Sequence, residues 1–224
     1  MSPQAKPRRS PARNPVVRSA AKPARKPAPR TRPAEERLGQ LMAAAQELFL
    51  ARGVAATSVE QVTARAGVAK GTFYLYFASK DELLAALGER FAHDHLATIS
   101  RALGKLRPDD WEGRLAAWAK SSVASYLDTV RLHDMLFHEA RQPSRRGLVD
   151  NIVIDHLGGL LAAGAAAKAW KVEDPRLTAV FLFSGVHALV DDALLAAGRK
   201  TVPRQALMAK AVDACFRAVG LGPS

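Results

Sequence analysis

The amino-acid sequence predicts an all-α fold with about nine helices over residues 34–224. Apolar residues recur at helical spacing through this region, and no stretch alternates apolar and polar residues with β-branched enrichment. Proline occurs only at the junctions between the apolar segments. The single cysteine, Cys215, excludes an intramolecular disulfide and indicates a reducing compartment or a small buried apolar residue.

Residues 1–33 differ from the rest of the chain in composition. They hold ten basic side chains, eight prolines and no acid, whereas the remainder holds 23 basic and 21 acidic side chains. Proline removes amide donors and prevents a stable helix, so this segment is predicted to be a disordered basic tail. Three interpretations stay open: a solvated extension, an arm that contacts DNA phosphates, and a mitochondrial transit peptide, whose amphipathic helix the prolines disfavour.

The first expected helix covers residues 34–52 and ends at Gly53, and its apolar face recurs at i, i+3, i+4, i+7 and i+8 (Leu41, Ala44, Ala45, Leu48 and Phe49). Two short helices are expected within residues 57–80. The pair Thr57 and Glu60 predicts a capping box, and Gly67 supplies the left-handed residue that a sharp turn needs. The second short helix is expected to begin near Ala69 and to place Ala69, Phe73 and Phe77 inward, and Ser79 with Glu82 predicts a capping box that opens the next helix. Two short helices joined by a glycine turn predict a helix-turn-helix DNA reader.

Five segments between residues 40 and 84 carry a family resemblance: QLMAAAQELFLARG (40–53), TSVE (57–60), GVAKGTFY (67–74), YF (76–77) and SKDELL (79–84). On these segments the chain resembles the TetR/AcrR family of one-component bacterial regulators. The resemblance implies a DNA-binding domain over residues 34–80 and a helical effector-binding and dimerisation domain over residues 81–224. It also implies a homodimer, a double-stranded operator and an unidentified small-molecule effector.

Eight residues are expected to contact DNA, in positions that match those the family uses: Thr57, Ser58, Lys70, Gly71, Thr72, Tyr74, Tyr76 and Lys80. Hydroxyl, phenol and ammonium groups donate to phosphates, Gly71 lets the backbone approach DNA closely, and Thr72 can touch a thymine methyl or a base edge. Two of these residues have a structural alternative, because Thr57 can serve only as a cap and Tyr76 can belong partly to the core. Phe73 and Phe77 are expected to be core residues.

The rest of the chain predicts helices over residues 80–103, 108–130, 131–140, 147–170, 174–197 and 201–219. Asp174 followed by Pro175 is a strong start signal. The helix over 174–197 is apolar on most sides, so it needs partners all round. One interpretation is that this helix and the last helix form half of an intersubunit four-helix bundle. The alternative is that it is a central core helix of the monomer. Gly158, Gly159 and Gly164 indicate close helix packing or, alternatively, a hinge.

A ligand pocket between helices is expected to be lined by aromatic residues, each of which can instead be ordinary core: Trp111, Trp118, Tyr126, Phe137 and Phe183. No metal site, cofactor or catalytic group is expected. His187 and Asp191 are an i, i+4 pair without a third ligand at a convincing spacing, and Cys215 has no nearby histidine and is expected in the core.

Together these features predict a homodimeric transcriptional repressor released from its operator by a small molecule. The alternative is an architectural, nucleoid-type DNA-binding protein dominated by its basic tail; an enzyme is not expected. A cytoplasmic location with no membrane partner is expected, because residues 1–30 lack an apolar core and the longest apolar runs, 157–167 and 179–190, are too short to span a bilayer.

Overall fold

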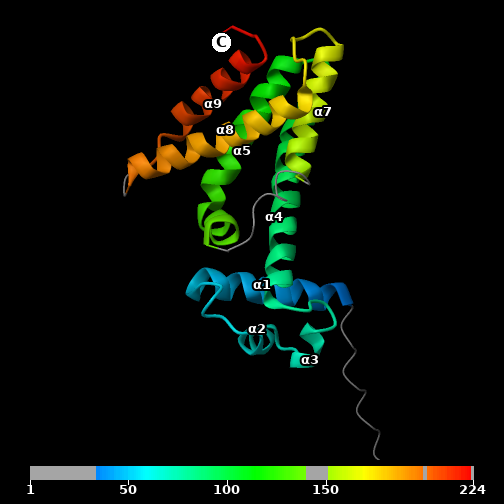
Figure 1. Ribbon diagram of the computed structural model, residues 1–224, viewed down its shortest axis with the longest axis vertical. Helices are drawn as coiled ribbons and strands as arrows, with labels where there is room; N and C mark the ends of the chain where they lie inside the picture. The colour runs from blue at the N-terminus through cyan, green and yellow to red at the C-terminus, as the bar shows by residue number, and fades with distance from the viewer. Residues whose placement is uncertain (1–33, 140–150, 199–200, 223–224) are drawn as a thin grey trace, which may run out of the picture. The chain divides into compact units, whose positions relative to one another are not determined.

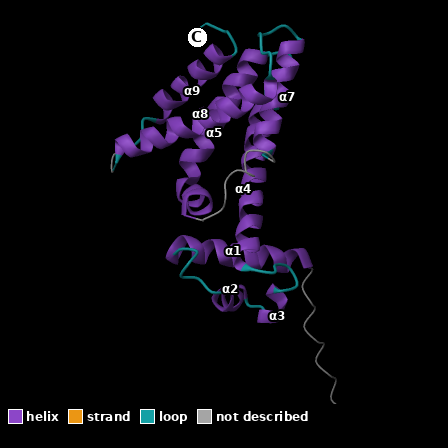
Figure 2. Ribbon diagram, viewed as in Figure 1, coloured by secondary structure: helices purple, strands orange, loops and turns teal. Residues whose placement is uncertain are grey.

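The computed structural model describes residues 34–139, 151–198 and 201–222. Within these residues the backbone forms eight α-helices and one short π-helix and contains no β-strand (Figures 1 and 2). The predicted all-α fold is therefore confirmed. The predictions for the tail over residues 1–33, and for a helix start at residue 147, lie outside the described residues.

The N-terminal helices are α1 (Ala34–Arg52), α2 (Val59–Ala66), α3 (Lys70–Phe73) and α4 (Lys80–Leu103). Helix α1 has the predicted range. The apolar faces of these helices meet in one core, to which Met135 and Leu136 of a later segment also contribute. Its fully buried side chains are Leu41, Ala45, Val62, Phe73 and Leu83. The three short helices are thus stabilised by packing against the first turns of α4, as their small size requires.

The start of α2 differs from the prediction by one residue. Ser58, not Thr57, is the N-cap: its hydroxyl accepts from the Gln61 amide at 3.3 Å, and the Gln61 side chain accepts from the Ser58 amide at 3.0 Å. The Thr57–Glu60 capping box was therefore wrong. Both pairs fit the capping-box spacing, but Thr57 is buried and donates its hydroxyl to the Gly53 carbonyl at 2.9 Å, so only Ser58 is free to cap.

The turn after α2 follows the prediction, whereas α3 is shorter than expected. Gly67 adopts the left-handed conformation with φ of 68° and ends α2. Helix α3 spans only four residues and continues as a turn to Phe77. Phe73 and Phe77 are buried as predicted, with ring centroids 5.7 Å apart, but Ala69 is exposed rather than inward.

Helix α4 begins at the predicted cap, although only half of the capping box forms. The Ser79 hydroxyl accepts from the Glu82 amide at 3.1 Å. The Glu82 carboxylate reaches one residue further back and accepts from the Ala78 amide at 2.6 Å. Both ends of this helix, at Lys80 and Leu103, lie where the sequence placed them.

The second part of the chain contains α5 (Trp111–Asp134), the π-helix η1 (Met135–Glu139), α7 (Ile152–Ala166), α8 (Pro175–Ala197) and α9 (Arg204–Ala218). The four α-helices of this part and the end of α4 share a second core, around Trp118 and Leu161, whereas η1 packs on the N-terminal core. Asp110 caps α5 by accepting from the Gly113 amide at 2.9 Å, so this helix begins later than the predicted Pro108–Asp109. Asp174 caps α8 as predicted, and Cys215 is buried.

The three glycines of α7 differ in how closely their neighbours pack. A Cβ atom at Gly164 would lie 2.1 Å from Cζ2 of Trp170, and one at Gly158 would lie 3.9 Å from the Ala179 Cβ on α8. A Cβ atom at Gly159 would meet nothing within 4 Å. The close-packing interpretation is therefore confirmed for Gly164, whereas a Cβ atom at Gly158 would fit at ordinary contact distance and Gly159 needs another explanation.

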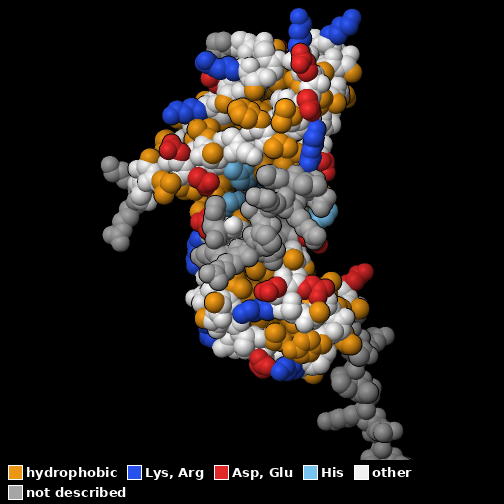
Figure 3. All heavy atoms as spheres, viewed as in Figure 1, with side chains coloured by type: hydrophobic (Ala, Val, Ile, Leu, Met, Phe, Trp, Pro, Cys, Tyr) orange, Lys and Arg blue, Asp and Glu red, His pale blue; other side chains and the backbone are white. Residues whose placement is uncertain are grey.

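Helix α8 is only partly covered within one chain. Leu177, Phe181 and Leu195 are 65%, 70% and 82% exposed, and their spacing places them along one side of the helix. Figure 3 shows apolar side chains at the surface along α8. By length and composition alone, helix α8 could cross a membrane. The sequence predicted no membrane span, because the longest uninterrupted apolar runs are too short. An apolar helix in the core of a soluble protein meets the same criterion of length and composition.

Candidate nucleic-acid interface and ligand cleft

The second short helix presents a group of exposed side chains on the surface opposite its buried Phe73. Lys70 and Gly71 are exposed, Thr72 is half-buried, and Tyr74 is 54% exposed. A Cβ atom at Gly71 would meet nothing within 4 Å, so the backbone there is open to an approaching partner. Ser58, the cap of α2, is also exposed. These five residues form the candidate nucleic-acid interface.

Lys70 is oriented by an acidic neighbour. Its ammonium group forms an ion pair with the Glu60 carboxylate of α2, and both side chains are more than half exposed. The hydrogen bond from Lys70 lowers the pKa of Glu60 to about 2, and the same bond raises the pKa of Lys70. Both groups are therefore charged at neutral pH, and Lys70 must exchange its carboxylate partner for a phosphate if it contacts DNA.

Three other predicted contact residues have structural partners. The Lys80 ammonium group donates to the Val54 carbonyl at 2.6 Å and to the Thr57 carbonyl at 2.8 Å. The Tyr76 phenol donates to the Ala34 carbonyl at 3.1 Å, and its ring packs on the N-terminal core. Thr57 is buried. The described conformation thus favours the structural alternative for Thr57 and Tyr76. Lys80 fastens the loop before α2 to the start of α4, and its predicted phosphate contact would require it to leave these carbonyl groups.

One apolar side chain at this surface was not among the predicted contact residues. Leu75 is 78% exposed beside Tyr74, and Figure 3 shows apolar side chains gathered on the surface over α3. Helical spacing from the buried Phe73 places Leu75 on the outward side, so the sequence contained this signal. Such a side chain can contact a thymine methyl group.

The interface has little positive charge of its own. Residues 34–82 contain five basic and six acidic side chains. One of the five, Arg65, donates to both carboxylate oxygens of Glu47 on α1, with a shortest distance of 2.6 Å. The folded reader can therefore supply few ammonium or guanidinium groups to a phosphate backbone.

The five aromatic residues predicted to line one pocket lie in three different places. Trp118 is fully buried in the core of the second part. Tyr126, Phe137 and Phe183 contact histidine rings: the His133 ring lies 4.0 Å from Tyr126 and 5.0 Å from Phe137, and the His187 ring lies 4.2 Å from Phe183. Trp111 alone lines a cleft. Tyr126, Phe137 and Phe183 thus gather around two histidines, apart from Trp118 and Trp111, and a role of these five residues in effector binding stays a prediction.

A histidine cluster that the sequence did not indicate joins α4, α5 and α8. His95 is 9% exposed, and its Nδ1 shares a hydrogen bond of 2.8 Å with the Ser125 hydroxyl. Burial, with smaller effects from His187 and His133, lowers the pKa of His95 to about 4. The Tyr126 phenol donates to the Asp191 carboxylate, and burial with this bond raises the pKa of Tyr126. Among the described residues no group of three or more His, Cys, Asp and Glu side chains is arranged to hold a metal ion.

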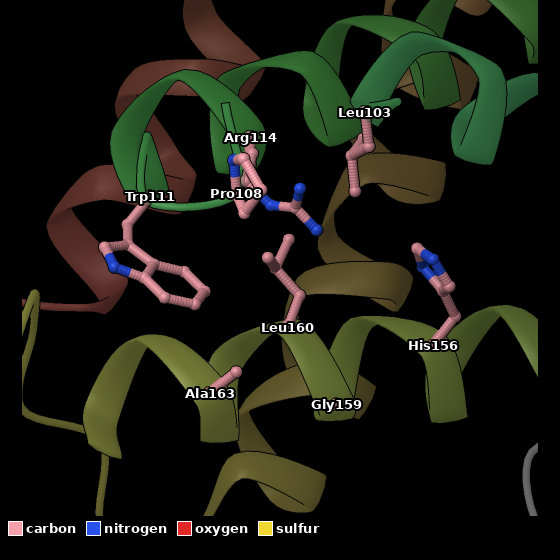
Figure 4. Close-up of a pocket in the computed structure, with 8 residues that line it drawn as sticks. All are labelled: Leu103, Pro108, Trp111, Arg114, His156, Gly159, Leu160 and Ala163. Atoms are coloured by element: carbon pink, nitrogen blue, oxygen red, sulfur yellow. The ribbon is translucent and has the colours of Figure 1, made fainter. Parts of the chain in front are cut away.

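A cleft of about 460 Å³ lies between the end of α4, the start of α5, and α7 (Figure 4). This volume is within the range of small-molecule sites. Figure 4 shows the Arg114 side chain extending into the middle of the cleft, with Trp111 on one side and His156 on the other. The lining residues are Leu103, Pro108, Trp111, Arg114, His156, Gly159, Leu160 and Ala163.

Comparison with known proteins finds relatives over most of the chain. The family model of bacterial regulatory proteins of the tetR family matches residues 41–87, which span most of α1 to the second turn of α4. The probable HTH-type transcriptional regulator ArpR of Pseudomonas putida is 30% identical over 176 residues, which are 72% of this chain and 82% of that protein. The HTH-type transcriptional repressor Rv3405c of Mycobacterium tuberculosis is 29% identical over 168 residues, or 71% of this chain and 84% of that protein.

Solved structures share the fold. RolR in complex with its ligand resorcinol superposes with a TM-score of 0.59 at 21% identity, over 85% of this chain and 90% of that chain. At this identity the likeness concerns the arrangement of helices and not the ligand. The family model covers the helices that present the candidate interface, and the structural likeness covers 85% of the chain.

Proposed function

The chain belongs to the TetR family of bacterial transcriptional regulators, and from this premise we propose that it is a homodimeric repressor that a small-molecule effector releases from its operator. Membership in the family makes the chain a helix-turn-helix regulator that binds DNA. The observation that carries the proposal further is the exposed surface of α3, with Thr72 and Tyr74 beside the open backbone of Gly71.

The proposed contacts sort into two kinds. Thr72 and Leu75 are placed to touch base edges or thymine methyl groups in the major groove, which gives sequence preference. Ser58, Lys70 and Tyr74 donate hydrogen bonds to phosphates, which fixes the position of the helix without reading sequence. Lys70 leaves Glu60 when DNA binds.

The proposed dimer forms through the exposed side of α8, together with α9. Leu177, Phe181 and Leu195 are the large apolar side chains that a second copy would cover. Full burial of each side chain contributes about 1.5–3 kcal/mol. A two-fold axis would place two copies of α3 in successive major grooves about 34–36 Å apart, so the operator would be an approximate inverted repeat.

The dimer is tested by the mass of the chain in solution. Phe181→Glu places a charge in the proposed contact and is expected to give a monomer in analytical ultracentrifugation. Leu75→Glu, at an equally exposed apolar residue outside the contact, is the matched control and is expected to remain a dimer. A monomeric wild-type chain, or a dimeric Phe181→Glu variant, contradicts the proposed contact.

Two further parts of the proposal concern the tail and the effector. We propose that the ten basic side chains of residues 1–33 contact DNA phosphates, as an arm that adds affinity without sequence preference. The proposed location of the protein is the cytoplasm. The effector acts by binding one arrangement of the second part of the chain better than the other, because a ligand shifts an equilibrium only by its difference in affinity.

The alternative, an architectural DNA-binding protein, predicts a different specificity ratio. A repressor is expected to prefer its operator over random duplex by about a thousandfold or more, whereas an architectural protein binds both similarly. Thr72→Ala is expected to lower operator affinity and leave random-duplex affinity unchanged. Lys120→Ala, which removes an exposed charge from α5, is the control and is expected to change neither. Equal affinity of the wild-type chain for selected and random duplexes would refute the repressor.

A further inference from the structure

Arg114 brings a permanent positive charge into the cleft without an acidic partner. Its Nε is buried and forms no hydrogen bond, and the side chain makes no ion pair with any other described residue. The residue as a whole is half-buried, but a buried N–H group without an acceptor is costly in free energy. Other arginines of the described chain, such as Arg65, Arg107 and Arg204, each pair with a carboxylate. Among the described arginines, Arg114 is the one whose guanidinium group has a buried nitrogen without a hydrogen-bond partner.

His156 does not supply a second positive charge. Its Nδ1 is also buried without a hydrogen-bond partner. Burial and the nearby guanidinium group of Arg114 both lower the pKa of His156, so the imidazole is neutral at pH 7. The cleft thus offers one permanent cation and one neutral imidazole, which suits a ligand with a single negative charge.

The walls of the cleft are apolar. Leu103 comes from the end of α4, Trp111 from the start of α5, and Leu160 from α7. Gly159 leaves one side open, since a Cβ atom there would meet nothing within 4 Å. This open glycine, which close packing does not explain, adds room for a ligand beside Leu160.

We propose that the cleft binds a small amphipathic carboxylate, with its anionic group on Arg114 and its apolar body against Leu103, Trp111 and Leu160. A guanidinium group matches the geometry of a carboxylate and can donate two parallel hydrogen bonds. The neutral imidazole of His156 can hold a further polar atom of the ligand. The identification of this carboxylate as the effector rests on the proposed function, whereas the binding site itself does not.

Helix α4 connects this cleft with the reader. Its first turns place Leu83, Leu84 and Leu87 in the N-terminal core, and its last residue, Leu103, lines the cleft. A ligand that contacts Leu103 therefore touches the same rigid helix on which α1, α2 and α3 pack. This gives the ligand a physical route to favour one placement of the reader over another.

The test is direct binding of two carboxylates, decanoate and 2-naphthoate, to the full-length chain without DNA, measured by calorimetry. Saturable binding of at least one is expected, and 1-decanol and 2-naphthol, which lack the charge, are expected to bind at least tenfold more weakly. Arg114→Met is expected to weaken carboxylate binding by about tenfold to a hundredfold, the effect of losing a hydrogen bond to a charged group. Arg107→Met, which removes an exposed charge outside the cleft, is the matched control and is expected to bind normally.

A second variant tests the location independently of charge. Ala163→Phe fills the cleft from an exposed position on α7 and is expected to abolish binding while α-helical content stays unchanged by circular dichroism. Binding of neither carboxylate, equal binding of acids and alcohols, or unchanged binding by Arg114→Met or Ala163→Phe each overturns the proposed site. Competition by inorganic phosphate, which has no apolar body, would show a plain anion site and also overturns it.

Operator release is measured separately. If a carboxylate binds the wild-type chain but not Arg114→Met, and the operator complex is unaffected, the site stands and its role as the effector site fails. If the chain shows no operator preference, the proposed repressor fails while the binding result remains valid.

Discussion

Replacing Gly164 by alanine is expected to destabilise the fold, although alanine favours helices more than glycine does. Gly164 lies inside α7, under the ring of Trp170, and an added Cβ atom would sit 2.1 Å from Cζ2 of that ring. Ordinary contact requires roughly 3.5–4 Å between carbon atoms, so the indole has to move by more than about 1 Å. Trp170 is buried, and its Nε1 donates to the Leu161 carbonyl at 2.8 Å, so this movement breaks or bends a buried hydrogen bond.

The magnitude follows from opposing contributions. Alanine in place of glycine in a helix interior gains about 1 kcal/mol. Overpacking of a core costs about 1–3 kcal/mol, and loss of the indole hydrogen bond leaves a buried donor unsatisfied at a cost of about 1–3 kcal/mol. A net decrease of about 1–5 kcal/mol in the free energy of unfolding is expected. For a chain of this size, 1 kcal/mol shifts Tm by about 2–4 °C.

Gly159→Ala is the matched control in the same helix. Its Cβ atom would meet nothing within 4 Å, so only the gain in helix propensity of about 1 kcal/mol remains, and Tm is expected to rise. Both variants are compared by thermal and denaturant unfolding followed by circular dichroism. If Gly164→Ala is as stable as Gly159→Ala, the close contact with Trp170 does not exist in solution and the reasoning is refuted.

Three other predictions concern buried charge, the loop before α2, and the tail. His95 has a pKa of about 4 in the folded chain against an ordinary value of 6.5, so the unfolded chain takes up its proton first as pH falls. The folded state is expected to lose about 3 kcal/mol of stability between pH 6.5 and pH 4, and His95→Gln is expected to remove that part of the pH dependence in denaturant titrations. Lys80→Met is expected to lower the free energy of unfolding by about 1–3 kcal/mol without DNA present, because two carbonyl groups lose their donor. Lys70→Met, at an exposed ion pair, is expected to change stability by less than about 1 kcal/mol and to weaken DNA binding; the opposite pattern would support the phosphate role of Lys80. Deleting residues 1–33 is expected to flatten the slope of log K against log salt by several units, at about 0.9 for each phosphate that the tail neutralises, without changing thermal unfolding; equal slopes for both forms would leave the tail as a solvated extension.

The ends of helices were predictable from the sequence where a local signal marked them. Gly53 ends α1, Ser79 starts α4, and Asp174 with Pro175 starts α8, because capping and left-handed glycine are decided by a few adjacent residues. The cap of α2 was misplaced by one residue, since Thr57 and Ser58 both fit the pattern. Only the burial of Thr57 against the N-terminal core separates them, and that depends on residues distant in sequence.

The direction of long side chains was the less predictable part of the site. Lys80 reaches back over more than twenty residues to the carbonyl groups of Val54 and Thr57, and Tyr76 reaches the first residue of α1. Helical spacing gives the side of a helix on which a residue lies, but not which distant carbonyl its end group finds. For the same reason the separation of the aromatic residues of the second part into core, histidine cluster and cleft could not be predicted.

The charge balance of the helix-turn-helix region bears on the proposed role of the basic tail. Residues 34–82 have one more acidic than basic side chain, and Lys70, Arg65 and Lys80 are all engaged with protein oxygen atoms. Binding to duplex DNA draws much of its affinity from cations that replace counterions on the phosphates. A reader with so few free cations can select a sequence through Thr72 and its neighbours while holding DNA only weakly. The ten basic side chains before residue 34 are the largest uncompensated positive charge in the sequence. If the proposed function holds, we expect the fold to select the operator and the tail to supply much of the attraction, so that selectivity and affinity would reside in different segments of one chain.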